Sequence, residues 1–185
     1  MVEEVGRVGS IAVQLAKHLG AHVATTVSTA KVDLVRELGA DEIVDYRTQD
    51  FETVLHDYDV VLDTLGGASL AKSLRVVRPG GRVISIAGPP TPDFARELGA
   101  HALVRMAMGA LSLRTRRRAK SRGVRYEFLF MKADGDQLRE LTTLIDAGKL
   151  CPVIDHVFPF GETREALDYV AKGRAKAGKV VISMV

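Results

Sequence analysis

The chain has 185 residues, of which 46% are hydrophobic, and it carries a formal net charge of +3. This length fits one domain, or one domain with part of a second, and the apolar fraction excludes wholesale disorder. No apolar run approaches the roughly 18 residues that a membrane-spanning helix needs. The single cysteine, Cys151, excludes an internal disulfide and a cysteine-rich zinc site. Residues 1–9 lack the apolar stretch of a signal peptide, so we expect a cytoplasmic protein.

The positive charge is concentrated in one segment, residues 114–125, which contains no acidic residue. Its seven cations are Arg114, Arg116, Arg117, Arg118, Lys120, Arg122 and Arg125, and without them the net charge of +3 becomes −4. Such a run can attract nucleic acid or an anionic membrane. It has no interleaved aromatic residues and matches no nucleic-acid-binding motif. We therefore favour a solvated basic helix or loop, and keep a nucleic-acid or anionic-surface binder as an alternative function.

Helical and strand patterns alternate along the chain. Apolar spacing predicts helices over 11–19, 32–38 and 68–77, the last closed by Pro79-Gly80-Gly81. Short β-branched or apolar runs predict strands over 22–27, 43–44, 59–64 and 82–87. This alternation predicts βαβ units and a parallel sheet with helices on both faces.

The second half of the chain continues with longer elements. Residues 91–125 are predicted to be helical, Glu127–Met131 a strand, and Asp134 the cap of a helix that runs to Gly148. After this point we expect an extended piece at 153–158, a helix at 162–172 and a strand at 180–185.

A glycine-rich turn, Gly6-Arg7-Val8-Gly9, precedes the first predicted helix. Such a turn lets backbone N–H groups approach a pyrophosphate, which the positive end of the helix favours. In the dinucleotide fingerprint G-x-G-x-x-G, Gly6 and Gly9 would be the second and third glycines, while Glu4 occupies the first position. A simple tight turn explains the two glycines about as well.

The end of the second strand distinguishes NAD from NADP. An NAD site usually has an acid about 20 residues past the glycines, where it holds the ribose hydroxyls. No acid occurs between Glu4 and Asp33, and the strand is followed instead by Ser28 and Lys31. A hydroxyl and an ammonium group suit a 2′-phosphate, hence NADP. The alternative, in which Ser28 caps the next helix and Lys31 is solvated, has equal weight from these residues alone.

Several motifs in this order are similar to a known family. They are VGSIAVQLAKHLGAHVATT, KVDLVRELGADEIVDYR, DVVLDTLGG, RPGGRVISIAG and the final GKVVISMV. Together they resemble the medium-chain dehydrogenase/reductase superfamily in its zinc-independent, quinone-oxidoreductase-like branch, whose members are alcohol-dehydrogenase-like. The resemblance implies a doubly wound Rossmann-like domain over residues 1–150. It also implies a tail at 151–185 that packs on a substrate domain.

The resemblance further implies an oxidoreductase that transfers hydride from NADP(H) to a quinone or an α,β-unsaturated carbonyl. The phosphate loop of the family is matched by Gly6, Val8 and Gly9, and its contacts to the 2′-phosphate by Ser28, Lys31 and Tyr46. The turns at the nicotinamide ribose are matched by Leu65, Gly66, Ala87 and Gly88. The strand end beside the nicotinamide is matched by Phe130 and Met131. It implies no metal, and no dedicated catalytic acid or base. The open edge of the 127–131 strand favours a homo-oligomer.

Departures from the family pattern bear on activity. The half that builds the substrate domain is not in this sequence, and the first strand of the sheet would end near Val2. That strand lies in the middle of the sheet, so its neighbours would lose a partner unless residues 1–5 form a shortened strand or a second chain supplies one. Glu4 would repel a nearby pyrophosphate, whereas Arg7 would attract it. The alternatives are therefore a truncated, inactive reductase and a non-catalytic NADP-binding or interaction module.

Overall fold

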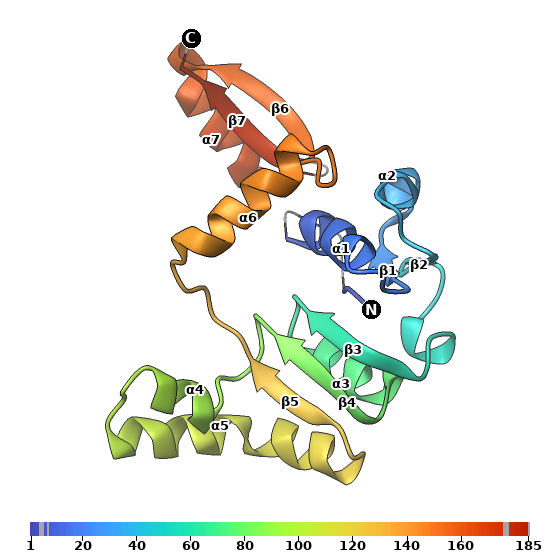
Figure 1. Cartoon of the computed structure of the whole chain (residues 1–185), viewed down its shortest axis with the longest axis vertical. Helices are drawn as coiled ribbons and strands as arrows, with labels where there is room; N and C mark the ends of the chain where they lie inside the picture. Colours follow the sequence, from blue (N-terminus) through green and yellow to red (C-terminus); the bar gives the residue numbers. More distant parts are fainter. Residues whose placement is uncertain (4–5, 7, 176–177, 185) are drawn as a thin grey trace.

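The computed structural model describes residues 1–3, 6, 8–175 and 178–184. Glu4 and Arg7 lie outside the described residues, so the expectations made for their charges are not addressed by it. The main sheet is parallel and contains β1 (Ala24–Val27), β2 (Glu42–Asp45), β3 (Tyr58–Asp63), β4 (Val77–Ser85) and β5 (Arg125–Phe128) (Figure 1).

The amino-terminal segment Met1–Glu3 lies between β1 and β3 and joins the two halves of this sheet. Val2 forms parallel bridges with both Thr25 and Leu62. Its N–H donates to the Ala24 carbonyl over 2.8 Å. The shortened first strand is therefore formed by this chain itself, and the strand order becomes β2, β1, Met1–Glu3, β3, β4, β5. This is the doubly wound order that the motifs predicted.

Helices cover both faces of the sheet, because each face carries its own apolar core. On one face α1 (Gly9–His18) and α2 (Val32–Glu37) pack over a cluster that includes Val13 and Val35. On the other, α3 (Gly67–Val76) and α5 (Ala102–Ser121) pack over a cluster that includes Leu74 and Ala119. The short helix α4 (Pro92–Glu97) contacts α5. The predicted helices at 11–19, 32–38 and 68–77 are confirmed within two residues.

Two predicted boundaries were wrong. Pro79-Gly80-Gly81 does not separate a helix from a strand, since β4 begins at Val77 and passes through it. The pairing with β3 shifts between Tyr58 and Val60, so these residues form an irregularity within the strand that Gly80 accommodates with φ +87°. The strand predicted at 127–131 is shifted toward the amino terminus, and β5 ends at Phe128.

The tail forms a separate small layer. After α6 (Gly135–Asp146), β6 (Ile154–Pro159) and β7 (Lys179–Ser183) pair in parallel, and α7 (Thr163–Ala171) packs against them (Figure 1). The Gln14 side chain links α1 to the start of this tail: it accepts from the Cys151 N–H (2.7 Å) and donates to the Cys151 carbonyl (2.9 Å).

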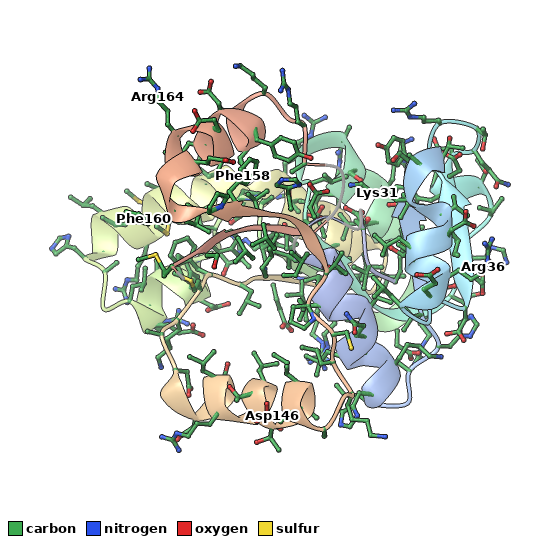
Figure 2. All side chains as sticks on the ribbon, turned by 90° about the horizontal axis from the view of Figure 1, so that it is seen from above. Lys31, Arg36, Asp146, Phe158, Phe160 and Arg164 are labelled. Carbon is green, nitrogen blue, oxygen red and sulfur yellow. The ribbon has the colours of Figure 1, made fainter. Side chains whose placement is uncertain are left out.

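Apolar side chains of the tail and of α6 remain uncovered. Phe160 is 62% exposed and Leu167 is 65% exposed, and no residue of α6 is buried. Figure 2 labels Phe160 and Arg164 on this part of the molecule and Asp146, the last residue of α6. That the tail packs on a further domain stays a prediction.

A cavity of about 660 Å³ lies at the amino ends of β1 and β3, lined by Val23, Tyr58 and Val60 and by Leu15 and Leu19 of α1. It is therefore at the opposite end of the strands from the site described below. In the described part of the chain, no helix combines the length and apolar character that crossing a membrane requires.

Candidate nucleotide-binding site

The candidate site lies at the carboxyl edge of the main sheet. The strands end in register: Val27 pairs with Asp45, Asp63 with Ser85, and Ser85 with Phe128. Because all strands are parallel, the residues that follow them emerge at one edge. The structure therefore brings Ser28, Tyr46, Leu65, Gly66, Ala87 and Gly88 to the same edge, followed by Phe130 and Met131 beyond β5. Gly6, Val8 and Gly9 reach this edge from the segment that follows Glu3.

The start of α1 is open to an anion. The side chain of Val8, the capping residue, does not cap the helix, while the Ser10 N–H donates to the Gly6 carbonyl over 3.1 Å. The first turn contains no acidic residue, and a Cβ built on Gly6 would meet nothing within 4 Å. The macrodipole of this ten-residue helix places partial positive charge at the same point. The backbone here fits a phosphate group.

A buried pair, Asp63 and Ser85, fixes the turns that follow β3 and β4. Both residues are fully buried, and the Ser85 hydroxyl donates to the Asp63 carboxylate. The other Asp63 oxygen accepts from the Gly66 N–H over 2.8 Å, and the Ser85 hydroxyl accepts from the Gly88 N–H over 2.7 Å. Two turns that are more than 20 residues apart in sequence are thus held by one hydrogen-bonded pair. The sequence analysis did not single out either residue.

The glycines in these turns have a packing role. Gly66 has φ +70°, and a Cβ at this position would lie 2.6 Å from the Ala87 carbonyl oxygen. A Cβ at Gly88 would lie 2.4 Å from the Tyr126 hydroxyl. The turns therefore contact each other and β5 so closely that a side chain is excluded at both positions. In contrast, Leu65 is 49% exposed and Ala87 is exposed, so they form the accessible surface of this part of the site.

The corner between β1 and β2 contains an acid that the sequence analysis did not consider. Asp45 ends β2 and accepts from the Thr29 hydroxyl over 2.6 Å. The Thr29 hydroxyl and the Arg47 N–H hold the pKa of Asp45 below its usual value. Ser28 makes no capping hydrogen bond with its side chain, so that alternative is not seen. Lys31 lies at the start of α2, with Arg36 near its other end (Figure 2).

The far end of the site is apolar. Phe130 is 61% exposed and Met131 is 87% exposed. The ring of Phe94 in α4 contacts both Phe128 (5.0 Å between centroids) and Phe130 (6.0 Å). These contacts hold the segment after β5 against α4 and leave one side of Phe130 accessible.

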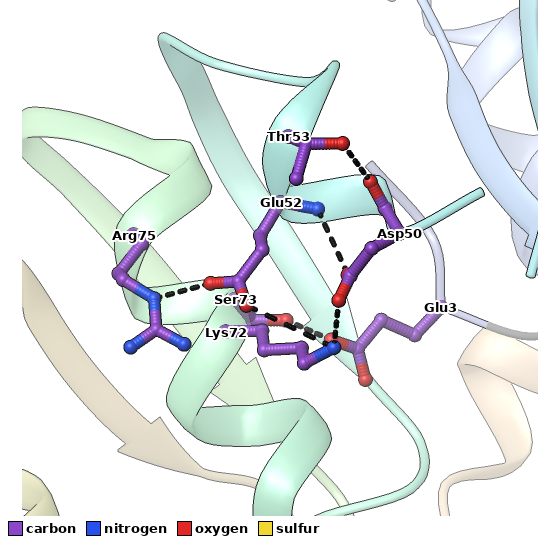
Figure 3. Close-up of polar contacts among 7 residues, drawn as sticks. All are labelled: Glu3, Asp50, Glu52, Thr53, Lys72, Ser73 and Arg75. Atoms are coloured by element: carbon purple, nitrogen blue, oxygen red, sulfur yellow. Dashed lines mark hydrogen bonds and ion pairs between the residues drawn. The ribbon is translucent and has the colours of Figure 1, made fainter.

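Glu3 is fully buried beneath the site. Its carboxyl group accepts from the Ser73 hydroxyl of α3, and its Oε2 atom has no partner among the described residues (Figure 3). Burial, and then the neighbouring Asp63, raise the pKa of Glu3 to about 9. The side chain is therefore neutral at pH 7 and adds no negative charge near the start of α1. On the surface, Lys72 and Arg75 of the same helix pair with Asp50 and Glu52.

Comparison with known proteins places this geometry in a family. A family model described as "Zinc-binding dehydrogenase" matches residues 38–182. The chain belongs to the zinc-binding dehydrogenase family. This confirms the resemblance to medium-chain dehydrogenases/reductases of the quinone-oxidoreductase type and the Rossmann-like fold, of which the chain covers the nucleotide-binding half.

Individual members of the zinc-binding dehydrogenase family support the assignment. The "NAD(P)H oxidoreductase RTN4IP1, mitochondrial" of Danio rerio is 34% identical, over 97% of this chain and 47% of the relative. The "NADPH-dependent alkenal/one oxidoreductase, chloroplastic" of Arabidopsis thaliana is 34% identical, over 96% of this chain and 38% of the relative. The solved structure of the quinone oxidoreductase from Coxiella burnetii has a TM-score of 0.75 at 25% identity, over 100% of this chain and 53% of that chain. The chain thus spans about half the length, or less, of the curated relatives it matches.

The name of the zinc-binding dehydrogenase family refers to a metal. Within residues 1–3, 6, 8–175 and 178–184, no three His, Cys, Asp or Glu side chains are grouped so that they could hold a metal ion. Cys151 is exposed, and its backbone is bound by Gln14. The described residues therefore do not fit a zinc site.

Proposed function

We propose that the chain is the nucleotide-binding half of an NADPH-dependent reductase of the quinone or enone type. The observation that carries this proposal is the carboxyl edge of the sheet, where an uncapped, glycine-bearing start of α1 lies beside two turns tied by Asp63 and Ser85. Relatives named as an alkenal/one oxidoreductase and a 2-methylene-furan-3-one reductase support the substrate class.

The residues at this edge fit a dinucleotide along its whole length. The positive end of α1 would face the pyrophosphate, since the Val8 side chain does not cap this end and the first turn contains no acid. Glu3 stays neutral because of its burial and does not oppose this binding. Gly6 leaves space above the backbone for the phosphate oxygens.

The adenosine end determines whether NADPH is preferred to NADH. Ser28, Lys31 and Tyr46 supply two hydroxyl groups and an ammonium group, and the adjacent Arg47 adds a second cation. Asp45 opposes an anion at this corner, although the Thr29 hydroxyl accounts for part of its hydrogen-bonding capacity. The cations outnumber this acid, which supports a 2′-phosphate and hence NADPH.

The residues at the nicotinamide end of the site would position the nicotinamide for hydride transfer. NADPH, when bound, supplies the hydride, and a proton from solvent completes the reduction of the quinone or conjugated C=C bond. The turns at 64–67 and 86–88 would orient the nicotinamide ribose, because Asp63 and Ser85 keep them rigid. The exposed ring of Phe130 would lie beside the nicotinamide and exclude water from one side of it.

The same edge of the sheet also fits a second candidate, a non-catalytic NADP-binding module, because nucleotide binding needs only the start of α1 and the turns that Asp63 and Ser85 hold. Two experiments separate the candidates. The first is titration calorimetry of the purified chain with NADPH, and with NADH as the control. The second is NADPH oxidation in the presence of a simple quinone or enone. Selective binding with turnover supports the reductase, and selective binding without turnover supports the module. Binding of neither nucleotide contradicts both.

A further inference from the structure

The helix α5 presents one uncovered face whose character changes along its length. Leu103, Ala107, Ala110, Arg114 and Arg117 follow the i, i+4, i+7 spacing of a single helical stripe, and all five are exposed. The opposite face, which includes the buried Ser112 and Ala119, packs on the sheet and α3. Figure 1 shows α5 at one end of the molecule, with its outer side away from the sheet.

The first half of this face is apolar. Leu103, Met106 and Leu111 are 65%, 68% and 68% exposed. Large apolar side chains are rarely exposed together on a surface that stays in water, and such apolar patches mark sites of interaction. No acidic residue lies anywhere in α5.

The second half of the face is cationic and unpaired. Among the described residues, Arg114, Arg117 and Arg118 form no ion pair or hydrogen bond through their side chains. A hollow of about 360 Å³ between α5 and β5 is lined by Lys120, Arg125 and the buried Ala119, so it lies on the side of α5 that packs on the sheet and not on this outer face. Arg116 differs from its neighbours: it is half-buried and donates to the Ser112 hydroxyl and the Gly109 carbonyl, each over 3.2 Å.

We propose that the outer face of α5, defined by Leu103, Met106, Leu111, Arg114, Arg117 and Arg118, docks on the surface of an anionic phospholipid bilayer. The cations complement the lipid phosphates, and the apolar half enters the boundary between headgroups and acyl chains. Nucleic acid would need only the cationic half, and it would leave the adjoining apolar side chains in water.

The test is flotation of the purified chain with phosphatidylcholine vesicles that contain, or lack, roughly one-third phosphatidylserine. We expect binding only to the anionic vesicles, and weaker binding at high salt. A triple change of Arg114, Arg117 and Arg118 to Gln should weaken binding on the order of 100-fold, because each cation contributes about a factor of five. Three exposed cations outside α5, Lys149, Arg164 and Arg174, provide the matched control when changed to Gln, and that variant should bind like the parent.

A second variant distinguishes lipid from other polyanions. Leu103, Met106 and Leu111 are changed together to Gln, and circular dichroism confirms that the fold is kept, as expected for side chains outside the core. The proposal expects this variant to lose vesicle binding at least 10-fold. The proposal is overturned by any of three results: no binding to anionic vesicles, vesicle binding that the apolar variant retains, or duplex DNA binding tighter than vesicle binding.

Discussion

Asp63 and Ser85 form a buried hydrogen-bonded pair across β3 and β4, and the same two side chains hold the turns that follow these strands. The relationship joins the core of the protein to its candidate site. Any change in this pair should therefore alter both the free energy of unfolding and the binding of NADPH.

Replacement of Asp63 by Ala should lower the free energy of unfolding by about 3 kcal/mol, because the buried Ser85 hydroxyl and the Gly66 N–H would no longer have the Asp63 carboxylate as acceptor. The control is Asp59→Ala on the same strand, whose exposed side chain pairs with Arg78 and whose loss should cost less than about 1 kcal/mol. Urea unfolding measures both. Equal effects of the two changes would contradict a structural role for the pair.

A methyl group at Gly66 should disrupt the contact between the two turns. Gly66→Ala combines a left-handed backbone with a Cβ only 2.6 Å from the Ala87 carbonyl oxygen, so we expect a loss of about 2–3 kcal/mol in the free energy of unfolding. Gly135→Ala is the matched control: it lies at the start of α6 with nothing within 4 Å, and should change stability by less than about 0.5 kcal/mol. Thermal unfolding is the measurement, and an unchanged melting temperature for Gly66→Ala would refute the expectation.

Glu3 should make stability fall as pH rises. The pKa of Glu3 in the folded chain is about 9, against an ordinary value of 4.5, so between these pH values the folded state binds one more proton than the unfolded state. The free energy of unfolding contributed by this group is therefore fully present below pH 4.5 and declines toward pH 9, by about 1 kcal/mol per pH unit. Glu3→Gln keeps a neutral partner for Ser73 and removes the titration.

The measurement for Glu3 is urea unfolding of the parent and Glu3→Gln between pH 5 and pH 9. We expect the variant to be more stable at pH 8 by about 1–3 kcal/mol and the difference to shrink toward pH 5. The comparison isolates Glu3, because all other titrating groups are shared. Parallel pH profiles would show that Glu3 is ionised in the folded chain.

Lys31 should distinguish NADPH from NADH. Lys31→Gln should weaken NADPH binding about 10-fold, as expected for loss of one charge-assisted contact to phosphate, and leave NADH binding unchanged. Arg36→Gln is the control, since Arg36 lies farther along α2 and pairs with Asp33 over 2.6 Å. Calorimetric titration of each variant measures the effect. A similar loss with both nucleotides would assign Lys31 a structural role instead.

Oligomer formation stays a prediction. β5 lies at the end of the sheet order and pairs only with β4 among the described strands, which leaves its other edge open. Sedimentation of the purified chain should therefore give a mass above that of the 20.1 kDa monomer. A monomer at all concentrations would contradict it.

The sequence by itself determined the local elements and the family. The apolar spacing of α1, α2 and α3 and the β-branched runs of β1 and β3 predicted a parallel sheet covered on both faces, because period and propensity are properties of neighbouring residues. The glycine-bearing strand ends predicted a candidate site, and the register of the strands brings them to one edge of the sheet. The boundaries predicted at Pro79-Gly80-Gly81 were wrong, because β4 pairs with β3 on both sides of these residues and this pairing overrides their local preference for a turn.

Only the tertiary structure decided which residues far apart in the sequence contact one another. Val2 replaces a central strand because β1 and β3 lie on either side of it, and no local pattern in Met1–Glu3 indicates this. Likewise, Asp63 and Ser85 each end a strand and meet only through the register of the sheet. Burial of Glu3, and the uncovered outer face of α5, also depend on which elements pack around them. Burial and register arise from contacts between residues far apart in sequence, and these contacts exist only once the chain has folded.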